Sequence, residues 1–235
     1  MAEKKQVDHS CAACASFKNS IWSTLGVTDL QKVDSQKICQ HLKKGSIFLQ
    51  EGGFPMGVYC ITHGKVKVYR HGDGRDQIIK IVGPGELLGY KSLLAEESYP
   101  VSAEALEDVH LCFIPKSTFL ETLFNSASFS HKILKMACKE LEIMTESITN
   151  MAQKTVRERT AATLLLLNQT YGSDSLEDGS VQINMRREDI ASIVGTATET
   201  LIRLLADFKQ ENLIQIDGRK VIIQNIQGLR KVAGL

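Results

Sequence analysis

The stretch that decides the fold is REDIASIVGTATETLIRLL, residues 187–205. Its apolar residues recur at helical spacing on both sides of Gly195, which predicts two helices joined by a sharp turn. We expect Thr196 to cap the second helix, and the small side chain of Ala191 to let the two helices cross closely. This pattern is typical of a helix-turn-helix.

A β-hairpin is predicted directly after the second helix. Residues 213–216 are mostly apolar, Asp217-Gly218 favours a tight turn, and residues 221–223 are again apolar. A hairpin in this position would be the wing of a winged helix-turn-helix.

The outward face of the second helix carries the residues with recognition chemistry. Arginine can bind guanine through two hydrogen bonds, and glutamate can accept a hydrogen bond from cytosine. Glu199 and Arg203 are spaced to address adjacent base pairs, but two structural alternatives stay open: an ordinary surface ion pair, or a capping box between Thr196 and Glu199. The predicted face consists of Thr198, Glu199, Ile202 and Arg203.

Upstream, a long helix is predicted from apolar residues that recur with a period close to 3.5. This period favours pairing with the same helix of a second copy, and the alternative is packing on its own domain. A hinge is expected at residues 150–154, a second helix at 155–171, and a polar loop at 172–180. The predicted dimer seam consists of Ile133, Ala137, Leu141, Met144, Ile148 and Met151.

Glycine and proline punctuate the N-terminal half, as they do between short strands. A hairpin tip is expected at residues 71–74. The fold class is therefore α+β: an N-terminal β-roll of the jelly-roll kind at 1–125, a dimerisation helix at 126–153, and a winged helix-turn-helix at 154–235. The predicted strands are residues 47–49, 58–61, 66–69, 78–82 and 109–114.

Composition limits the classes of function. The 235 residues include 28 Lys and Arg against 27 Asp and Glu, so there is no global basic excess that would by itself predict nucleic-acid binding. No window approaches the ~18 apolar residues of a membrane span, and no export signal is visible. A cytoplasmic protein is expected, with its six cysteines as free thiols, metal ligands or redox groups rather than a disulfide framework. No catalytic motif is present, so an enzyme is not predicted.

With these motifs in place, the chain resembles the CRP/FNR family of transcription regulators over nearly its whole length. The resemblance implies a homodimer, double-stranded DNA and RNA polymerase as partners, and a base-reading role for Glu199 and Arg203. It also implies a phosphate contact from Arg187 and a variable, half-site-tuning role for Thr198 and Ile202. Arg186, Arg219 and Lys220 are further candidates for phosphate contacts, and Thr196 is a further candidate DNA-binding residue.

The resemblance fails at the cyclic-nucleotide cassette. Family members that bind cyclic nucleotides hold the ribose with a Glu and the cyclic phosphate with an Arg. The matching stretches here are Gly89-Tyr90-Lys91-Ser92-Leu93 and Tyr99-Pro100-Val101-Ser102, which contain neither. Lys91 is either a substitute point charge or a solvated lysine. Cyclic AMP is therefore not expected as the effector, and the candidate pocket residues are Tyr90, Lys91 and Tyr99.

The cysteines match the iron-sulfur branch of the family only in part. Cys11, Cys14 and Cys112 match three of its four ligands, but the remaining position falls on Ser20, and Cys39 is expected in a different, helical segment. A metal cluster, a thiol switch and unused thiols all stay open. Cys60 and Cys138 are expected to be buried, and the histidines are scattered, so no haem or other cofactor is predicted.

Together these features predict a homodimeric, sequence-specific DNA-binding regulator of transcription. It would bind a near-palindromic operator and respond to a signal at the β-roll that the sequence does not identify. The alternative is a ligand-binding regulatory module, or a metal or redox sensor, whose main role is not DNA readout.

Overall fold

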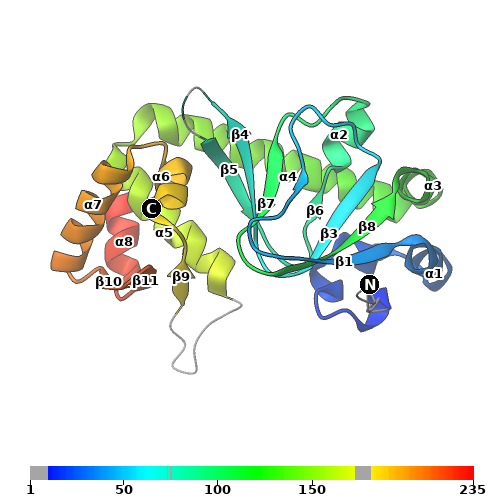
Figure 1. Ribbon diagram of the computed structural model, residues 1–235, viewed down its shortest axis with the longest axis horizontal. Helices are drawn as coiled ribbons and strands as arrows, with labels where there is room; N and C mark the ends of the chain where they lie inside the picture. The colour runs from blue at the N-terminus through cyan, green and yellow to red at the C-terminus, as the bar shows by residue number, and fades with distance from the viewer. Residues whose placement is uncertain (1–9, 73, 75, 173–180) are drawn as a thin grey trace, which may run out of the picture. The chain divides into compact units, whose positions relative to one another are not determined.

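The computed structural model describes residues 10–72, 74, 76–172 and 181–235 (Figure 1). These residues form two compact units: one contains residues up to 70 together with 80–142, and the other contains 71–79 together with 143–235. No helix in the described part of the chain is long and apolar enough to cross a membrane.

The first unit contains two four-stranded sheets, in the orders β1-β8-β3-β6 and β2-β7-β4-β5. All five predicted strands are confirmed, as β2, β3, β4, β5 and β8, whereas β1, β6 and β7 were not predicted. The predicted hairpin tip between β4 and β5 lies partly outside the described residues. The strands are β1 Ile38–Leu42, β2 Ile47–Leu49, β3 Gly57–His63, β4 Val66–His71, β5 Asp76–Val82, β6 Leu87–Leu88, β7 Ser102–Ala105 and β8 Val109–Pro115.

Strand β8 shows how the sequence builds two cores. Val109 and Leu111 point to one face, where they join an apolar cluster that includes Ile61, Val68 and Ala103. Cys112 and Ile114 point to the opposite face, since successive side chains of a strand alternate. Each face of this sheet is therefore covered by a different apolar layer.

Helices and short 3-10 turns cover the second face of that sheet. Trp22, Phe119 and Phe129 are fully buried there, and the rings of Trp22 and Phe129 stack with centroids 5.3 Å apart. The helical elements of this part are η1 Cys11–Ala13, η2 Phe17–Asn19, η3 Ile21–Thr24, α1 Val27–Gln36, α2 Tyr90–Ala95, α3 Lys116–Asn125 and α4 Ala127–Gln153.

Helix α4 has 27 residues and is the predicted long helix. Ile133, which the sequence assigns to the dimer seam, is wrongly placed there: it is buried in the core of its own unit beside Phe129. Ala137 packs partly against the same cluster, whereas Leu141, Met144, Ile148 and Met151 are exposed. Leu134 is also exposed and was missed, because its one-residue offset from Ile133 places it on the outward side.

Within the second unit, helix α5 has a well-defined start. Thr155 caps α5 in a capping box with Glu158, directly after the end of α4, where the sequence predicts a hinge. That this joint moves stays a prediction. The predicted loop at 172–180 lies outside the described residues except for Gly172. The elements are α5 Val156–Tyr171, β9 Gln182–Asn184, α6 Arg187–Val194, α7 Thr198–Gln210, β10 Ile214–Asp217, β11 Lys220–Ile223 and α8 Ile226–Ala233.

Two elements of this unit were not predicted. Strand β9 extends the predicted hairpin to a three-stranded sheet in the order β10-β11-β9. Helix α8 follows the hairpin and buries Leu229 and Ala233. The fold class predicted from the sequence is confirmed: a β-sandwich, a long helix and a winged helix-turn-helix.

Candidate functional site

The turn between α6 and α7 is built as the sequence predicts. Gly195 adopts a left-handed conformation, with φ of 73°, immediately after α6. The amides of Gly195 and Thr196 both donate to the carbonyl of Ala191, at 2.9 and 3.1 Å. Glycine is the residue that accepts this backbone conformation without steric cost. The turn therefore fixes the direction in which α7 starts.

Arg159 of α5 reinforces this turn, and sequence reasoning missed it. Its Nε donates to the carbonyl of Val194 at 3.1 Å, and its Nη1 donates to the carbonyl of Lys154 at 2.9 Å. Both are carbonyls at helix C-termini, which lack partners within their own helices. The side chain ties the end of α6 to the start of α5.

The predicted cap of α7 is wrong. The N-cap residue is Ala197, and no side chain caps the helix. Thr196 contributes its amide to the preceding turn instead, so the capping box with Glu199 does not form. The carboxylate of Glu199 is consequently not engaged by the start of its own helix.

Helix α7 divides into a buried and an exposed face. Leu201, Leu204, Leu205 and Phe208 are buried, whereas Glu199, Ile202 and Arg203 are exposed. Within the described residues, neither Glu199 nor Arg203 has a hydrogen-bond or ion-pair partner, so the surface ion pair considered above is not formed. Both groups are available to an external partner. Thr198 is half-buried in the first turn of the helix.

The predicted wing is confirmed. Strands β10 and β11 pair antiparallel from Ile214 and Ile223 to Asp217 and Lys220, and Gly218 in the turn has a positive φ of 54°. Arg187 of α6 donates to the carbonyls of Arg219 at 3.0 Å and Gly218 at 3.3 Å.

The half-buried guanidinium of Arg187 thus positions the wing turn, and burial holds its pKa below the usual value while the group stays charged. The predicted phosphate contact of Arg187 stays a prediction. Arg186 and Arg219 are exposed near the same turn, and Lys220 is half-buried.

Removal of Arg159 should loosen the turn without touching the exposed face of α7. We expect Arg159→Ala to lower the free energy of unfolding of the second unit by about 1–3 kcal/mol, because buried carbonyls lose a charged donor. Urea unfolding followed by circular dichroism at 222 nm measures this loss. Arg203→Ala is the matched control and should leave stability unchanged; equal effects of the two variants would contradict the positioning role of Arg159.

Two of the candidate effector residues line a groove, and the third lies in an apolar cluster. Tyr90 and Lys91 line a shallow, mostly apolar groove formed by α2, α3 and α4, whereas Tyr99 belongs to the apolar cluster between the sheets. Gly89, with a φ of 86°, starts α2 and lies against the ring of Tyr99. Tyr99 does not line this groove, and a shared effector pocket of Tyr90, Lys91 and Tyr99 stays a prediction.

Glu140 of α4 pairs with the cationic side chains of this region. Its carboxylate accepts from Lys80 at 2.7 Å, from Lys91 at 2.9 Å and from the hydroxyl of Tyr90 at 3.2 Å. Burial would by itself raise the pKa of Glu140, but the ammonium groups of Lys80 and Lys91 hold the pKa below its usual value. Lys91 is thus neither a free point charge nor merely solvated.

This cluster predicts a defined pH dependence. Because the pKa of Glu140 is depressed in the folded state, its stabilisation is complete above its unfolded pKa and is lost as pH falls through the folded pKa. We expect Glu140→Gln to lower the free energy of unfolding by about 1–3 kcal/mol at pH 7. The difference in this free energy between variant and parent should become smaller as the pH falls below 4.5, the ordinary pKa of a glutamate.

Urea unfolding followed by the fluorescence of Trp22, the single tryptophan of the chain and buried in the first unit, measures this difference. Glu142→Gln, on the exposed side of the same helix, is the control. If the difference in free energy of unfolding between the parent and Glu140→Gln stays constant from pH 7 to pH 3, the assigned role of Glu140 is ruled out.

The histidines are less scattered than the sequence indicates. His41, His110 and His63 lie opposite one another on β1, β8 and β3, with ring centroids 4.7 and 5.6 Å apart. Among the described residues, however, no three His, Cys, Asp or Glu side chains are arranged so that they could hold a metal ion.

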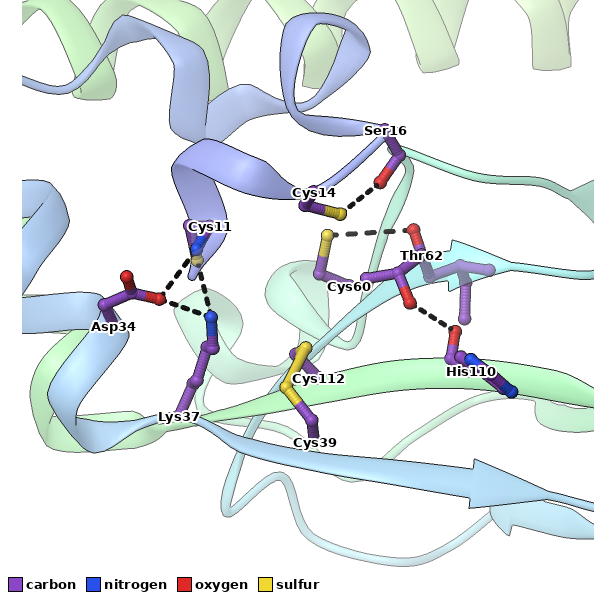
Figure 2. Close-up of a disulfide and its surroundings, with 11 residues drawn as sticks. Cys11, Cys14, Ser16, Asp34, Lys37, Cys39, Cys60, Thr62, His110 and Cys112 are labelled. Carbon is purple, nitrogen blue, oxygen red and sulfur yellow. Dashed lines mark hydrogen bonds and ion pairs between the residues drawn. A yellow bond between two sulfur atoms is a disulfide. The ribbon is translucent and has the colours of Figure 1, made fainter. Parts of the chain in front are cut away.

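The cysteines are arranged differently from the prediction. Cys39 lies on strand β1 rather than on a helix, and it forms a disulfide with Cys112 of β8 (Figure 2). Cys60 is buried as predicted, but Cys138 is exposed, so its predicted burial is wrong. Ser20, at the position of the missing cluster ligand, donates its hydroxyl to the carbonyl of Phe17.

Comparisons with known proteins agree with this architecture. Residues 39–126 match the cyclic nucleotide-binding domain family, and residues 158–232 match the Crp-like helix-turn-helix domain family. The chain is 28% identical over 227 residues to the transcriptional activator protein anr of Pseudomonas aeruginosa, covering 95% of this chain and 92% of that protein. It is 25% identical over 226 residues to the anaerobic regulatory protein of Haemophilus influenzae, covering 95% and 88%.

Solved structures show the same fold. FixK2 from Bradyrhizobium japonicum aligns with a TM-score of 0.74 at 24% identity, over 83% of this chain and 96% of that one. A CRP/FNR-family transcriptional regulator from Thermus thermophilus aligns with a TM-score of 0.69 at 22% identity, over 84% and 98%.

A β-sandwich that matches the cyclic nucleotide-binding domain family, followed by a Crp-like helix-turn-helix, is the domain organisation of a class of DNA-binding transcription regulators. The chain belongs to the CRP/FNR family and is a DNA-binding regulator of transcription.

Proposed function

We propose that the protein is a homodimer that reads a near-palindromic DNA operator with helix α7 and is switched by a signal at the β-roll. The observation that carries this proposal is the exposed pair Glu199 and Arg203, which is free of partners within the described residues. A guanidinium and a carboxylate one helical turn apart on an exposed N-terminal face supply a donor and an acceptor for base edges.

The surroundings of this pair support a groove-binding role. Ile202, beside the pair, is 52% exposed and offers an apolar contact to a thymine methyl group. Arg186, Arg219 and Lys220 lie at the wing and at the start of α6, where they would contact phosphates and fix the register. Local positive charge thus serves in place of a basic excess of the whole chain.

Helix α4 supports the dimer. Leu134, Leu141 and Ile148 recur every seven residues and are 63%, 66% and 68% exposed. Ala137, Met144 and Met151 recur at the same interval beside them. Two such rows are the a and d positions of a paired coiled coil, which would present two α7 helices to two half-sites. The seam proposed here contains Leu134 in place of Ile133.

The residues of the cassette do not fit cyclic AMP as the signal. Glu140 already neutralises Lys80 and Lys91, and the residues that hold ribose and cyclic phosphate in relatives are replaced, so cyclic AMP is not proposed as the effector. The protein would act in the cytoplasm on double-stranded DNA, with RNA polymerase as its downstream partner, and by binding rather than catalysis. A ligand-binding module without DNA readout is the alternative that the next experiment addresses.

Loss of either base-reading side chain should weaken specific binding. We expect Glu199→Ala and Arg203→Ala to bind a duplex selected from a random library by the parent protein about 5- to 150-fold more weakly, equivalent to about 1–3 kcal/mol. Fluorescence anisotropy at fixed salt measures the affinities, because phosphate contacts make them salt-dependent.

Lys209→Ala, at the far end of the same helix, is the control and should stay within about twofold of the parent. Parent-like affinity of both test variants would show that α7 does not read bases through this pair. Failure of the parent to enrich any duplex would favour the module without DNA readout.

Disruption of the α4 seam should separate the two copies. We expect Ile148→Glu to sediment near the monomer mass of 26.0 kDa, while the parent sediments at twice that mass, because two carboxylates would be buried at the seam. Sedimentation velocity at micromolar concentration makes the measurement. Leu166→Glu, an exposed leucine of α5, is the matched control; a parent that is itself monomeric would contradict the proposed dimer.

A further inference from the structure

Three cysteines form a row across one sheet of the first unit. Cys39 of β1 lies opposite Cys112 of β8, and Cys112 lies opposite Cys60 of β3. Residues opposite one another in antiparallel strands share a face, so the three sulfurs project from the same side of the sheet. Figure 2 shows them beneath the N-terminal segment that carries Cys11 and Cys14.

Only one pair in this row is bonded. Cys39 and Cys112 form a disulfide, with Cα atoms 4.1 Å apart and a sequence separation of 73. Both are partly exposed, whereas Cys60 is only 4% exposed. The two bonded cysteines are thus less deeply buried than Cys60.

Two of the neighbouring thiols are poor competitors for this bond. Burial raises the pKa of Cys60 to about 12, and burial together with Asp34 raises the pKa of Cys11 to about 11. A protonated thiol is not a nucleophile, so neither of these two residues attacks the disulfide at neutral pH.

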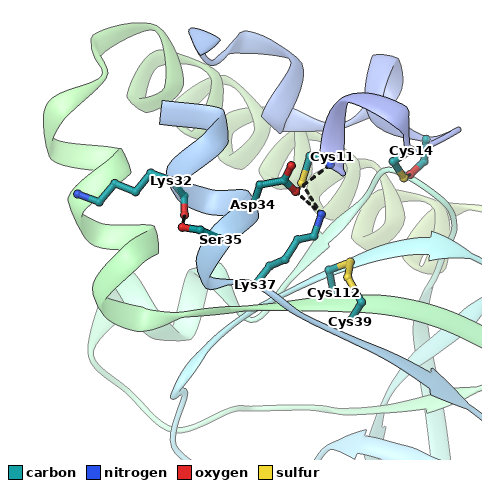
Figure 3. Close-up of polar contacts among 9 residues, drawn as sticks. Cys11, Cys14, Lys32, Asp34, Ser35, Lys37, Cys39 and Cys112 are labelled. Carbon is teal, nitrogen blue, oxygen red and sulfur yellow. Dashed lines mark hydrogen bonds and ion pairs between the residues drawn. A yellow bond between two sulfur atoms is a disulfide. The ribbon is translucent and has the colours of Figure 1, made fainter. Parts of the chain in front are cut away.

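The disulfide also connects two parts of the first unit. Strand β1 is the edge strand of its sheet, and β8 is an inner strand that leads directly into α3. Asp34 accepts from the backbone amide of Cys11 at 2.8 Å and pairs with Lys37, whose Nζ lies 3.2 Å from the sulfur of Cys11 (Figure 3). The N-terminal segment, α1 and β1 are thereby linked to one another and, through the disulfide, to β8.

We propose that Cys39 and Cys112 are a reversible thiol–disulfide site whose redox state sets the affinity of the protein for DNA. The regulatory half of this inference rests on the proposed function. A disulfide in a protein that works in a reducing compartment is commonly transient or redox-sensing, and partly exposed disulfides are the more easily reduced ones.

The reaction is a two-electron exchange. A thiolate of a dithiol reductant attacks one sulfur of the Cys39–Cys112 bond, so that this bond breaks and a mixed disulfide forms. The second thiolate of the reductant resolves it, which leaves two cysteine thiols and an oxidised, cyclic reductant. In the reverse direction, a small-molecule disulfide takes up two electrons and two protons from Cys39 and Cys112 and leaves as two thiols.

Differential alkylation of the full-length protein tests whether the Cys39–Cys112 bond breaks and forms reversibly. Folded protein is treated with dithiothreitol or with glutathione disulfide, blocked with N-ethylmaleimide, and mapped by mass spectrometry. We expect Cys39 and Cys112 to be labelled only after dithiothreitol, and to be linked again after glutathione disulfide. Exposed Cys138 should be labelled in the reduced protein and serves as the internal control.

Measurements of DNA affinity test whether the redox state of Cys39 and Cys112 regulates the protein. On the selected duplex, the affinities of the reduced and oxidised parent should differ at least about fivefold, the lower end of measured allosteric couplings. Cys39→Ser and Cys112→Ser should each show one affinity under both treatments, and Cys138→Ser should behave as the parent does.

The outcomes separate the claims. A Cys39–Cys112 bond that survives dithiothreitol in the folded protein, or that does not form again, overturns the reversible site. Reversible alkylation with equal DNA affinities in both states overturns the regulatory role. A protein that binds no duplex in either state overturns the proposed function instead, and the alkylation pattern then still decides the chemistry.

Discussion

The backbone conformation at Gly195 is the constraint on which the DNA-binding unit depends. A positive φ at this residue ends α6, sends two amides back to the carbonyl of Ala191, and sets the direction of α7. Arg159 fixes the same turn from α5, and Arg187 fixes the wing from α6. The exposed face of α7 is therefore presented by a framework that these hydrogen bonds hold, and Glu199 and Arg203 are left for a partner.

In the first unit, by contrast, charged side chains pair with one another. Glu140 supplies a carboxylate from within the chain and pairs with Lys80 and Lys91. The cations are thus neutralised without a ligand. The chemically distinctive groups of this unit lie instead on the other sheet, where cysteines and histidines line up across β1, β8 and β3.

How much could be predicted from sequence depended on how local the signal was. Three signals were local, and each predicted an element that the structure contains. They are Gly195 for the turn, Asp217-Gly218 for the hairpin, and the heptad spacing for helix α4. Strand β1 was missed because Ile38-Cys39-Gln40-His41-Leu42 has little strand propensity and pairs with residues more than 60 positions away. The disulfide was missed for the same reason, since Cys39 and Cys112 meet only through that pairing. Ile133 and Thr196 were misassigned because the choice between adjacent positions is made by tertiary packing and turn geometry.

The most direct test of the central claim, that two copies present two α7 helices to one duplex, is hydroxyl-radical footprinting on a selected operator. The account predicts two protected patches on one face of the DNA, with centres about one helical turn, or 10–10.5 base pairs, apart. A single protected patch at saturating protein, or uniform protection without register, would contradict it.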